Sequence, residues 1–395
     1  MVAGTAATLG FSRVGLGQQA VAPGGPVRVE RQPTGSEIWQ VTHEQFMQTV
    51  IYCEISYGSR DSRYFVYQRK NPKLPGKNHT EFMVVEMGTW KQHRLDVSIG
   101  TPGCAMSHNG VFYYLKHTGG DALDLMRADL VEGKPQKVYR LERERLTGSL
   151  GTVTTDGRYY ARGVCPLDDQ WKTFGIRLVD LEQGQQKILD QDPFIFNAHP
   201  QLEPGEGKTL MVQQNRGSKF SPEGKRLRSC GPEGATLYLV SVPGGKRTPL
   251  EVGKPHTAPI SGHQAWIGTT KEILLTAGGN LLAVRAGEPT RVVVKETPYR
   301  FYHIGSSRCG RLFCCGDRRG GYNVVIGSPQ TGETARICDA KTKTIGPPRT
   351  IKNTHPRPYL MPDLKWVIFQ SNRTGWPHIY AARVPEGIVE ELLEV

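Results

Sequence analysis

The sequence predicts an all-β fold, a seven-bladed β-propeller built from four-stranded antiparallel blades. Two observations lead to this prediction: short strand-like segments recur along the 395-residue chain, and turn residues stand at the same place in each repeat. The composition agrees, because 46 glycines and 27 prolines are spread along the chain and hydrophobic residues make up 37% of it. Helix signals are poor throughout.

The second strand of each repeat is the clearest element. These segments start ~40–60 residues apart, close to the repeat length of propeller blades made of four strands. The longest interval contains Gly217–Gly234, a basic segment with Gly and Pro that we expect to be a loop. The second strands are Tyr64–Tyr67, Val111–Leu115, Arg158–Ala161, Thr209–Val212, Glu272–Leu275, Arg311–Cys314 and Trp366–Phe369.

Turns rich in Asp, Gly or Pro accompany these strands and supply the chemistry of tight strand connections. The first blade is expected to start within Gln48–Ser56. A strand from one terminus is expected to complete the sheet of the other terminus, which would close the ring and remove free sheet edges. We therefore expect one propeller domain over residues 41–395, after a tail or signal-like segment over residues 1–40. The turns are Ser59–Ser62, Thr155–Gly157, Gly205–Gly207, Ser307–Gly310 and Met361–Asp363.

The first 22 residues are small and apolar, and Ala20–Ala22 would suit cleavage of a signal segment, although no basic stretch precedes them. A disordered tail is the alternative. A cleaved signal would place the protein in the periplasm or outside the cell, and otherwise it would be cytoplasmic. No later stretch approaches the ~20 apolar residues of a membrane span.

The formal net charge of +13 favours a polyanionic partner, with plain solubility as the alternative explanation. No dense Lys/Arg run with interleaved aromatic residues occurs, so nucleic acid is not the expected partner. The expected partner is an acidic oligosaccharide or polysaccharide. The eight cysteines form no CxxC pair, which argues against a zinc knuckle.

Four of the eleven histidines stand at the starts of late blades: His199, His263, His303 and His355. Because the innermost strand of every blade lines the central channel, residues at equivalent positions converge near the axis. Two or three neutral imidazoles at one point can hold a divalent metal, and another can accept a proton. The alternative is that each histidine only bonds a neighbouring blade's backbone. His108, in the turn of the second blade, is a reserve candidate.

At these motifs the sequence resembles the oligogalacturonate lyases, seven-bladed propeller enzymes that cleave short pectin fragments. The resemblance runs from about residue 45 onward. It is carried by Gly262-His263-Gln264-Ala265-Trp266, by His303 to Gly310, by His355-Pro356 through Tyr380, and by His199-Pro200-Gln201.

The resemblance implies a manganese-type site on the axis, with a histidine base and an arginine beside it. His263 matches the base, and His303 and His355 match metal ligands. Asn353 stands where the family has another histidine and Thr350 where it has a glutamine. These departures leave Asn353 or His199 as a further ligand and suggest a relative with a different uronate substrate.

The expected chemistry is β-elimination at a uronate. A base removes the C5 proton once a divalent metal or an arginine neutralises the neighbouring carboxylate. Arg216 is the candidate arginine, and Arg373 a second carboxylate binder. Tyr302 could act as the acid, as in the His/Tyr pair of ulvan lyases. The further candidates for binding substrate are Trp266, Trp376 and His199.

Three other functions compete with oligogalacturonate cleavage as explanations of the sequence. The chain could be a lyase on ulvan, glucuronan or a glycosaminoglycan. It could also be a non-catalytic propeller that serves as an interaction scaffold, although axial histidines have no obvious use there. A serine peptidase propeller is excluded, because no GxSxG motif or hydrolase domain is present.

Overall fold

The computed structural model describes residues 25–119, 122–141, 146–165, 167–168, 170–294, 297–318, 322–343, 345, 350 and 352–394. Over these ranges the chain is built from antiparallel strands, with one short helix, α1 (Ile388–Leu393). The predicted all-β fold is confirmed. No helix in the described ranges is long and apolar enough to cross a membrane.

Most strands form four-stranded antiparallel sheets that follow chain order. Each predicted second strand overlaps one observed strand. These strands are β4 (Tyr64–Arg69), β8 (Val111–His117), β12 (Tyr159–Val164), β16 (Thr209–Asn215), β22 (Ile273–Ala277), β26 (Phe313–Asp317) and β30 (Trp366–Ser371). The sheets with simple order are β3 (Gln48–Thr49), β4 (Tyr64–Arg69), β5 (Thr80–Glu86), β6 (Gln92–Ser98); β7 (Ala105–Met106), β8 (Val111–His117), β9 (Leu123–Asp129), β10 (Gln136–Leu141); β11 (Leu146–Val153), β12 (Tyr159–Val164), β13 (Phe174–Asp180), β14 (Gln185–Asp192); and β25 (Phe301–Ser306), β26 (Phe313–Asp317), β27 (Asn323–Gly327), β28 (Thr334–Asp339).

A longer sheet contains two further groups of four strands. The single pair Ala235–Ile260 joins these groups. The segment expected to be a loop within Gly217–Gly234 includes a short hairpin, whose Phe220 packs on Phe174 and Phe196. The groups are β15 (Gln201–Leu202), β16 (Thr209–Asn215), β19 (Ala235–Ser241), β20 (Arg247–Pro249), and β21 (Ile260–Trp266), β22 (Ile273–Ala277), β23 (Asn280–Val284), β24 (Arg291–Val292); the hairpin is β17 (Lys219–Phe220) and β18 (Arg226–Arg228).

The two ends of the chain meet in one sheet, as the sequence predicts. Its order is β1 (Val27–Arg31), β2 (Glu37–Gln40), β31 (His378–Arg383), β30 (Trp366–Ser371) and β29 (Tyr359–Leu360). Residues 27–40 thus contribute two strands, although they belong to the range expected to be a tail. The signal-like segment at residues 1–22 lies outside the described residues. The domain boundaries stay a prediction.

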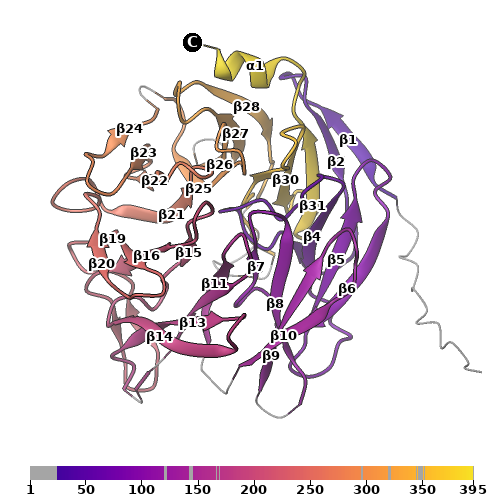
Figure 1. Ribbon diagram of the computed structural model, residues 1–395. Helices are drawn as coiled ribbons and strands as arrows, with labels where there is room; N and C mark the ends of the chain where they lie inside the picture. Colours follow the sequence, from indigo (N-terminus) through magenta and orange to yellow (C-terminus); the bar gives the residue numbers. More distant parts are fainter. Residues whose placement is uncertain are drawn as a thin grey trace, which may run out of the picture.

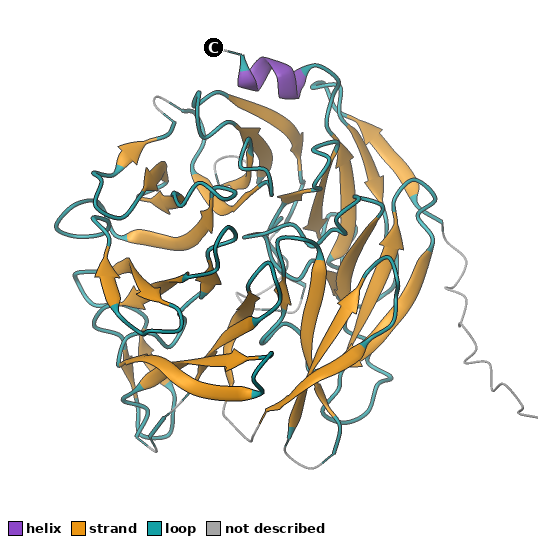
Figure 2. Ribbon diagram, viewed as in Figure 1, coloured by secondary structure: helices purple, strands orange, loops and turns teal. Residues whose placement is uncertain are grey.

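The sheets surround a common centre, with strands such as β7, β11, β15 and β25 nearest to it and β1 at the periphery (Figures 1 and 2). Neighbouring sheets pack face to face through aromatic side chains; Phe82 of β5 and Phe112 of β8, for example, meet edge to face at 4.9 Å between ring centroids. The inner strands are also direct neighbours, β7 beside β11 and β21 beside β25. Side chains at matching positions of different sheets therefore come together at the centre.

Candidate active site at the start of the inner strands

The structure brings the four blade-start histidines together. The ring centroids of His263 and His303 are 4.3 Å apart, those of His303 and His355 5.3 Å, and those of His199 and His263 6.5 Å. His263 and His303 are only 6% and 4% exposed. The predicted convergence is thus observed, while the roles of these histidines stay predictions. We call these four residues the imidazole cluster.

Irregular backbone aims these rings at the centre. The pairing of β21 with β22 shifts register between Ile260 and Gln264, and that of β25 with β26 shifts between Tyr302 and Gly305. Such bulges re-aim side chains and are frequent beside active sites. His303 also adopts a positive φ of 53°, a conformation that non-glycine residues rarely hold without a structural or functional reason.

Gly305 lets the neighbouring strand segment approach. A Cβ at this position would lie 1.9 Å from the carbonyl oxygen of Cys53. The chain that follows β3 therefore runs against β25 and carries its own polar side chains into the centre.

Tyr52 and Glu54 join the imidazole cluster from that segment. The Tyr52 hydroxyl lies 3.3 Å from Nδ1 of His263, and a Glu54 carboxylate oxygen lies 2.6 Å from Nδ1 of His199. The sequence reasoning missed both. A signal was available, because both residues lie within Gln48–Ser56, the segment expected to start the first blade, and the later histidines also stand at blade starts.

Two arginines and Tyr302 complete the surroundings. The Tyr302 ring lies 4.4 Å from that of His263, centroid to centroid. The Arg318 guanidinium lies 4.2 Å from the Tyr302 ring, and that of Arg357 lies 5.4 Å from the Tyr52 ring. Within the described part of the chain, neither guanidinium donates a hydrogen bond, and Nε of Arg357 is buried without a partner.

Three histidines of this cluster, His263, His303 and His355, are held neutral. Burial, then the charges of His199, Arg357 and other neighbours, lowers the pKa of His263 well below its ordinary value. Burial also lowers the pKa of His303 strongly, and that of His355 to about 4, with Arg357 and Arg318 contributing. At neutral pH these imidazoles carry lone pairs, which is the form that can accept a proton.

The two arginines singled out from the sequence have their donors occupied elsewhere. Arg216 donates from Nε, Nη1 and Nη2 to the backbone oxygens of Gly234, Lys254 and Glu233 at 2.9–3.1 Å. It holds the Gly217–Gly234 segment in place.

Arg373 is occupied in the same way. It donates to the Glu30 carboxylate at 2.6 Å and to the backbone oxygens of Asp339 and Ala340. It thereby ties the N-terminal strand β1 to the last sheets. Arg357 and Arg318 are better placed to bind a carboxylate than either predicted arginine.

The predicted stacking residues lie apart from the imidazole cluster. Trp266 is 6% exposed and donates from Nε1 to the Gln201 carbonyl at 3.0 Å, at the far end of β21. Trp376 is partly buried, and the Lys352 ammonium lies 4.7 Å from its ring. Trp266 is thus a core residue with one edge on a cavity.

The residues present do not fit a three-ligand metal site. Asn353 accepts a hydrogen bond from the Ile345 backbone at 2.6 Å, which occupies its side-chain oxygen. His303 and His355 have buried Nδ1 atoms without partners, but no group of three or more His, Cys, Asp or Glu in the described ranges could hold a metal. Arg357 and Arg318 also oppose a dication here.

Known proteins match this chain in structure only: no family model and no curated sequence matches it. An oligogalacturonate lyase from Vibrio parahaemolyticus superposes with a TM-score of 0.68 at 18% identity, over 92% of this chain and 97% of that one. An oligogalacturonate lyase in complex with manganese gives 0.69 at 16% identity, over 93% and 100%.

A third solved structure extends the likeness to another kind of protein. The β-propeller domain of Cps50 (Swd1) from Myceliophteria thermophila gives a TM-score of 0.53 at 11% identity, over 85% of this chain and 97% of that one. Likeness at such identities concerns the fold. The chain thus has a propeller-like fold similar to that of the oligogalacturonate lyases, as its motifs led us to expect.

Proposed function

We propose that the chain is a seven-bladed propeller and a polysaccharide lyase that cleaves uronate-containing oligosaccharides by β-elimination at the imidazole cluster. One observation carries the proposal: a buried, neutral His263 bonded to Tyr52 lies beside Arg357 and Arg318, whose guanidinium groups donate no hydrogen bond to any described residue. A base and a carboxylate binder are the two parts that this reaction requires.

His263 is the base. In the tautomer whose Nδ1–H donates to the Tyr52 oxygen, Nε2 carries the lone pair, and it takes the C5 proton of the uronate. Tyr52 is a positioning residue, since its hydroxyl orients the imidazole ring of His263. The low pKa of His263 keeps the base ready at neutral and mildly acidic pH.

Arg357 and Arg318 hold the substrate carboxylate. Removal of the C5 proton builds negative charge on this group, and guanidinium donors stabilise that charge through bidentate hydrogen bonds. A metal ion is not needed for this step, because the two arginines supply the positive charge themselves.

Tyr302 is the acid. The electrons of the C5–H bond form the C4=C5 double bond, the C4–O4 bond breaks, and O4 takes the proton of the Tyr302 hydroxyl. Solvent then restores the Tyr302 proton, and His263 releases the proton from C5. The products are one fragment with a 4,5-unsaturated uronate at its new non-reducing end and a leaving fragment with a new reducing end.

The substrate class rests on this chemistry and on the fold shared with oligogalacturonate lyases, so oligogalacturonate is the first substrate to test. Ulvan, glucuronan and a glycosaminoglycan are the other uronates that the same parts could serve. The assay incubates the protein with each of the four and follows the ultraviolet absorbance of the unsaturated product. Signal on at least one uronate is expected. No signal on any of them, with and without Mn²⁺, would overturn the proposed activity.

A further inference from the structure

A cavity lies toward the far end of the inner strands, about three residues beyond the imidazole cluster. In β21 His263 lies near the middle and Trp266 ends the strand, and in β25 His303 is followed three residues later by Ser306. Three residues of strand span about 10 Å. The cavity has an empty volume of about 710 Å³, including its opening to solvent.

Arg308 gives this cavity a positive charge. Its Nη2 donates to the backbone oxygens of Ser56 and Gly58. Within the described ranges it has no ion pair with a carboxylate, and neither Nε nor Nη1 donates a hydrogen bond. Burial lowers the pKa of Arg308 to about 10, so it stays charged at neutral pH. A partly buried cation without a counter-ion is costly, and an anion would offset this cost.

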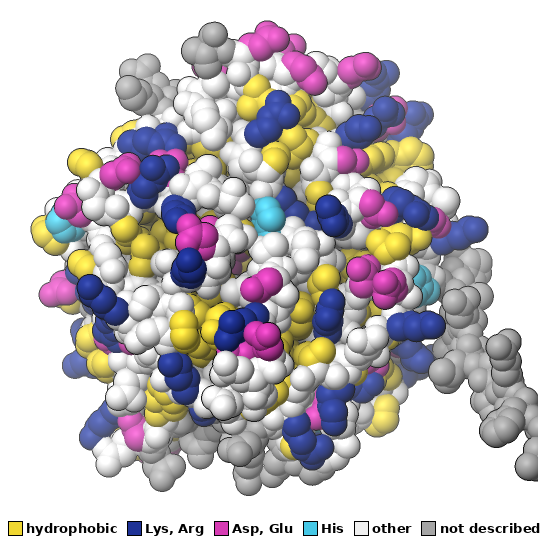
Figure 3. Space-filling model, viewed as in Figure 1, with side chains coloured by type: hydrophobic (Ala, Val, Ile, Leu, Met, Phe, Trp, Pro, Cys, Tyr) yellow, Lys and Arg dark blue, Asp and Glu magenta, His cyan; other side chains and the backbone are white. Residues whose placement is uncertain are grey.

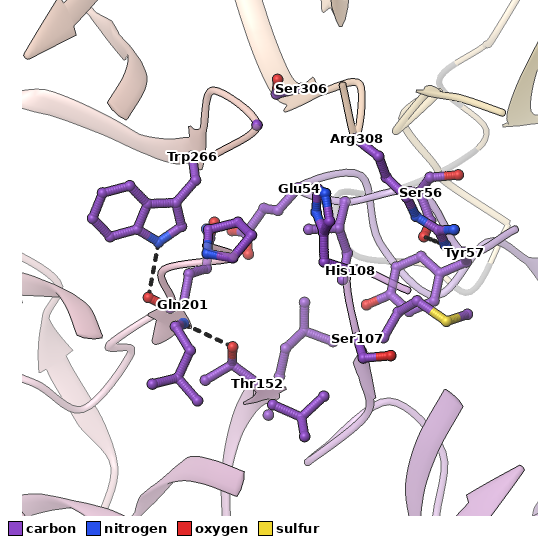
Figure 4. Close-up of a pocket in the computed structure, with 18 of the residues that line it drawn as sticks. Glu54, Ser56, Tyr57, Ser107, His108, Thr152, Gln201, Trp266, Ser306 and Arg308 are labelled. Atoms are coloured by element: carbon purple, nitrogen blue, oxygen red, sulfur yellow. Dashed lines mark hydrogen bonds between the residues drawn. The ribbon is translucent and has the colours of Figure 1, made fainter. Parts of the chain in front are cut away.

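His108 lies beside Arg308 on the cavity wall (Figure 4). It has no hydrogen-bond partner in the described part of the chain. Burial, and then the charge of Arg308, lowers its pKa. The neutral imidazole therefore adds a donor and an acceptor without adding charge.

The rest of the wall is suited to hydroxyl groups. Oε1 of Gln201 and the hydroxyl of Tyr57 are both buried without a hydrogen-bond partner among the residues that the structure describes. In Figure 4 Gln201 lies across the cavity from Arg308 and Tyr57. The wall also carries Ser56, Ser107, Thr152, Ser306 and Ser307. A ligand with an anionic group at one end and hydroxyls along its length would satisfy both sides.

Negative charge in the wall is already paired. Glu54 lines the cavity, but its carboxylate bonds His199 at 2.6 Å. Because Glu54 touches both places, the cavity and the imidazole cluster are adjacent along the axis. None of the four clustered histidines lines the cavity itself.

We propose that this cavity is a second binding site for a small sugar acid, whose carboxylate pairs with Arg308 and whose hydroxyls bond His108, Tyr57 and Gln201. The site is separate from the imidazole cluster and does not depend on the proposed lyase activity. Surface charge does not single out this site, because basic and acidic side chains are interspersed over the face shown in Figure 3.

Isothermal titration calorimetry with D-gluconate tests the site, with glucose, acetate and inorganic phosphate as comparison probes. Gluconate is expected to bind the unchanged protein, and Arg308→Met is expected to weaken it at least ~10-fold. Arg311→Met, at an exposed arginine three residues away, is the matched control and should bind as the unchanged protein does.

Two further variants keep the result interpretable. His108→Phe fills the cavity and leaves the contacts of Arg308 in place, so it should also weaken gluconate even if Arg308→Met does not fold. His263→Ala should bind gluconate normally, because His263 belongs to the other site. The proposal would be overturned if both cavity variants bound gluconate as tightly as the unchanged protein does. It would also be overturned if His263→Ala lost gluconate binding. If glucose or phosphate bound as tightly as gluconate, this would contradict the claim that the cavity selects a sugar acid.

Discussion

The hydroxyl of Tyr52 lies 3.3 Å from Nδ1 of His263, although 211 positions separate the two residues in the chain. The contact joins the segment that follows strand β3 to strand β21. It gives the imidazole ring of the proposed base a fixed orientation. In the proposed mechanism, a change at Tyr52 should therefore alter the chemistry at His263 while leaving substrate binding largely intact.

Tyr52→Phe removes this hydrogen bond and retains the ring. We expect kcat to fall roughly 3–10-fold with little change in KM, because one hydrogen bond of ordinary strength is lost. Steady-state kinetics on the best uronate measures both. Tyr160→Phe is the control, since its hydroxyl bonds the Gly103 carbonyl at 2.6 Å away from the imidazole cluster. An equal fall in both variants would indicate a general effect of losing a buried hydroxyl.

Arg357→Met should lower kcat/KM by roughly 10–100-fold, the value of a hydrogen bond to a charged group. It should also shift the acidic limb of the pH profile. The charge of Arg357 lowers the pKa of His263, so its removal raises that pKa and moves the loss of activity to higher pH. The exposed Arg285→Met serves as control. A larger loss in Arg216→Met than in Arg357→Met would restore the assignment made from the sequence.

Metal dependence separates the two ways of neutralising the carboxylate. If Arg357 and Arg318 do this, activity should survive dialysis against EDTA and should not rise when Mn²⁺ is added. The measurement is the initial rate before and after chelation. Loss of activity on chelation and its return with Mn²⁺ would contradict the arginine account and would favour His303 and His355 as ligands.

His378 should make the fold sensitive to acid. It is 3% exposed, its Nδ1 lies 2.9 Å from Oε1 of Gln48, and burial lowers its pKa to about 4. Because the folded pKa is below the unfolded value, the unfolded chain binds the proton first, and stability falls as pH drops below 6.5. The expected loss is on the order of 2 kcal/mol between pH 7 and pH 5.

Urea unfolding of the unchanged protein and of His378→Gln at these two pH values checks this. Glutamine has no titrating group, so the variant should lose less stability between pH 7 and pH 5. The same pH dependence in both proteins would show that His378 is not the source.

Much of the fold could be predicted because its signals are local. Short runs of consecutive hydrophobic residues, with turn residues beside them, mark strands such as β8 and β30 wherever they occur. The convergence of His199, His263, His303 and His355 could also be predicted from the sequence, because the inner strands of a propeller share one axis. Hydrogen-bond partners are different, because they depend on which distant segments meet.

The arginines singled out from the sequence, Arg216 and Arg373, illustrate why hydrogen-bond partners are hard to predict. Nothing near Arg216 in the sequence shows that the backbone oxygens of Gly234 and Lys254 fold back onto it. Arg357 follows His355 by two residues, and its importance appears only when Tyr52 from the first sheet lies beneath it.

The activity of His263→Ala tests the central claim most directly. The unsaturated product is measured on the uronate that the unchanged protein cleaves best, with His256→Ala, at an exposed loop histidine, as the control. We predict a loss of at least ~100-fold for His263→Ala, the usual contribution of a general base, and near-normal activity for the control. Undiminished cleavage by a folded His263→Ala protein would contradict the account.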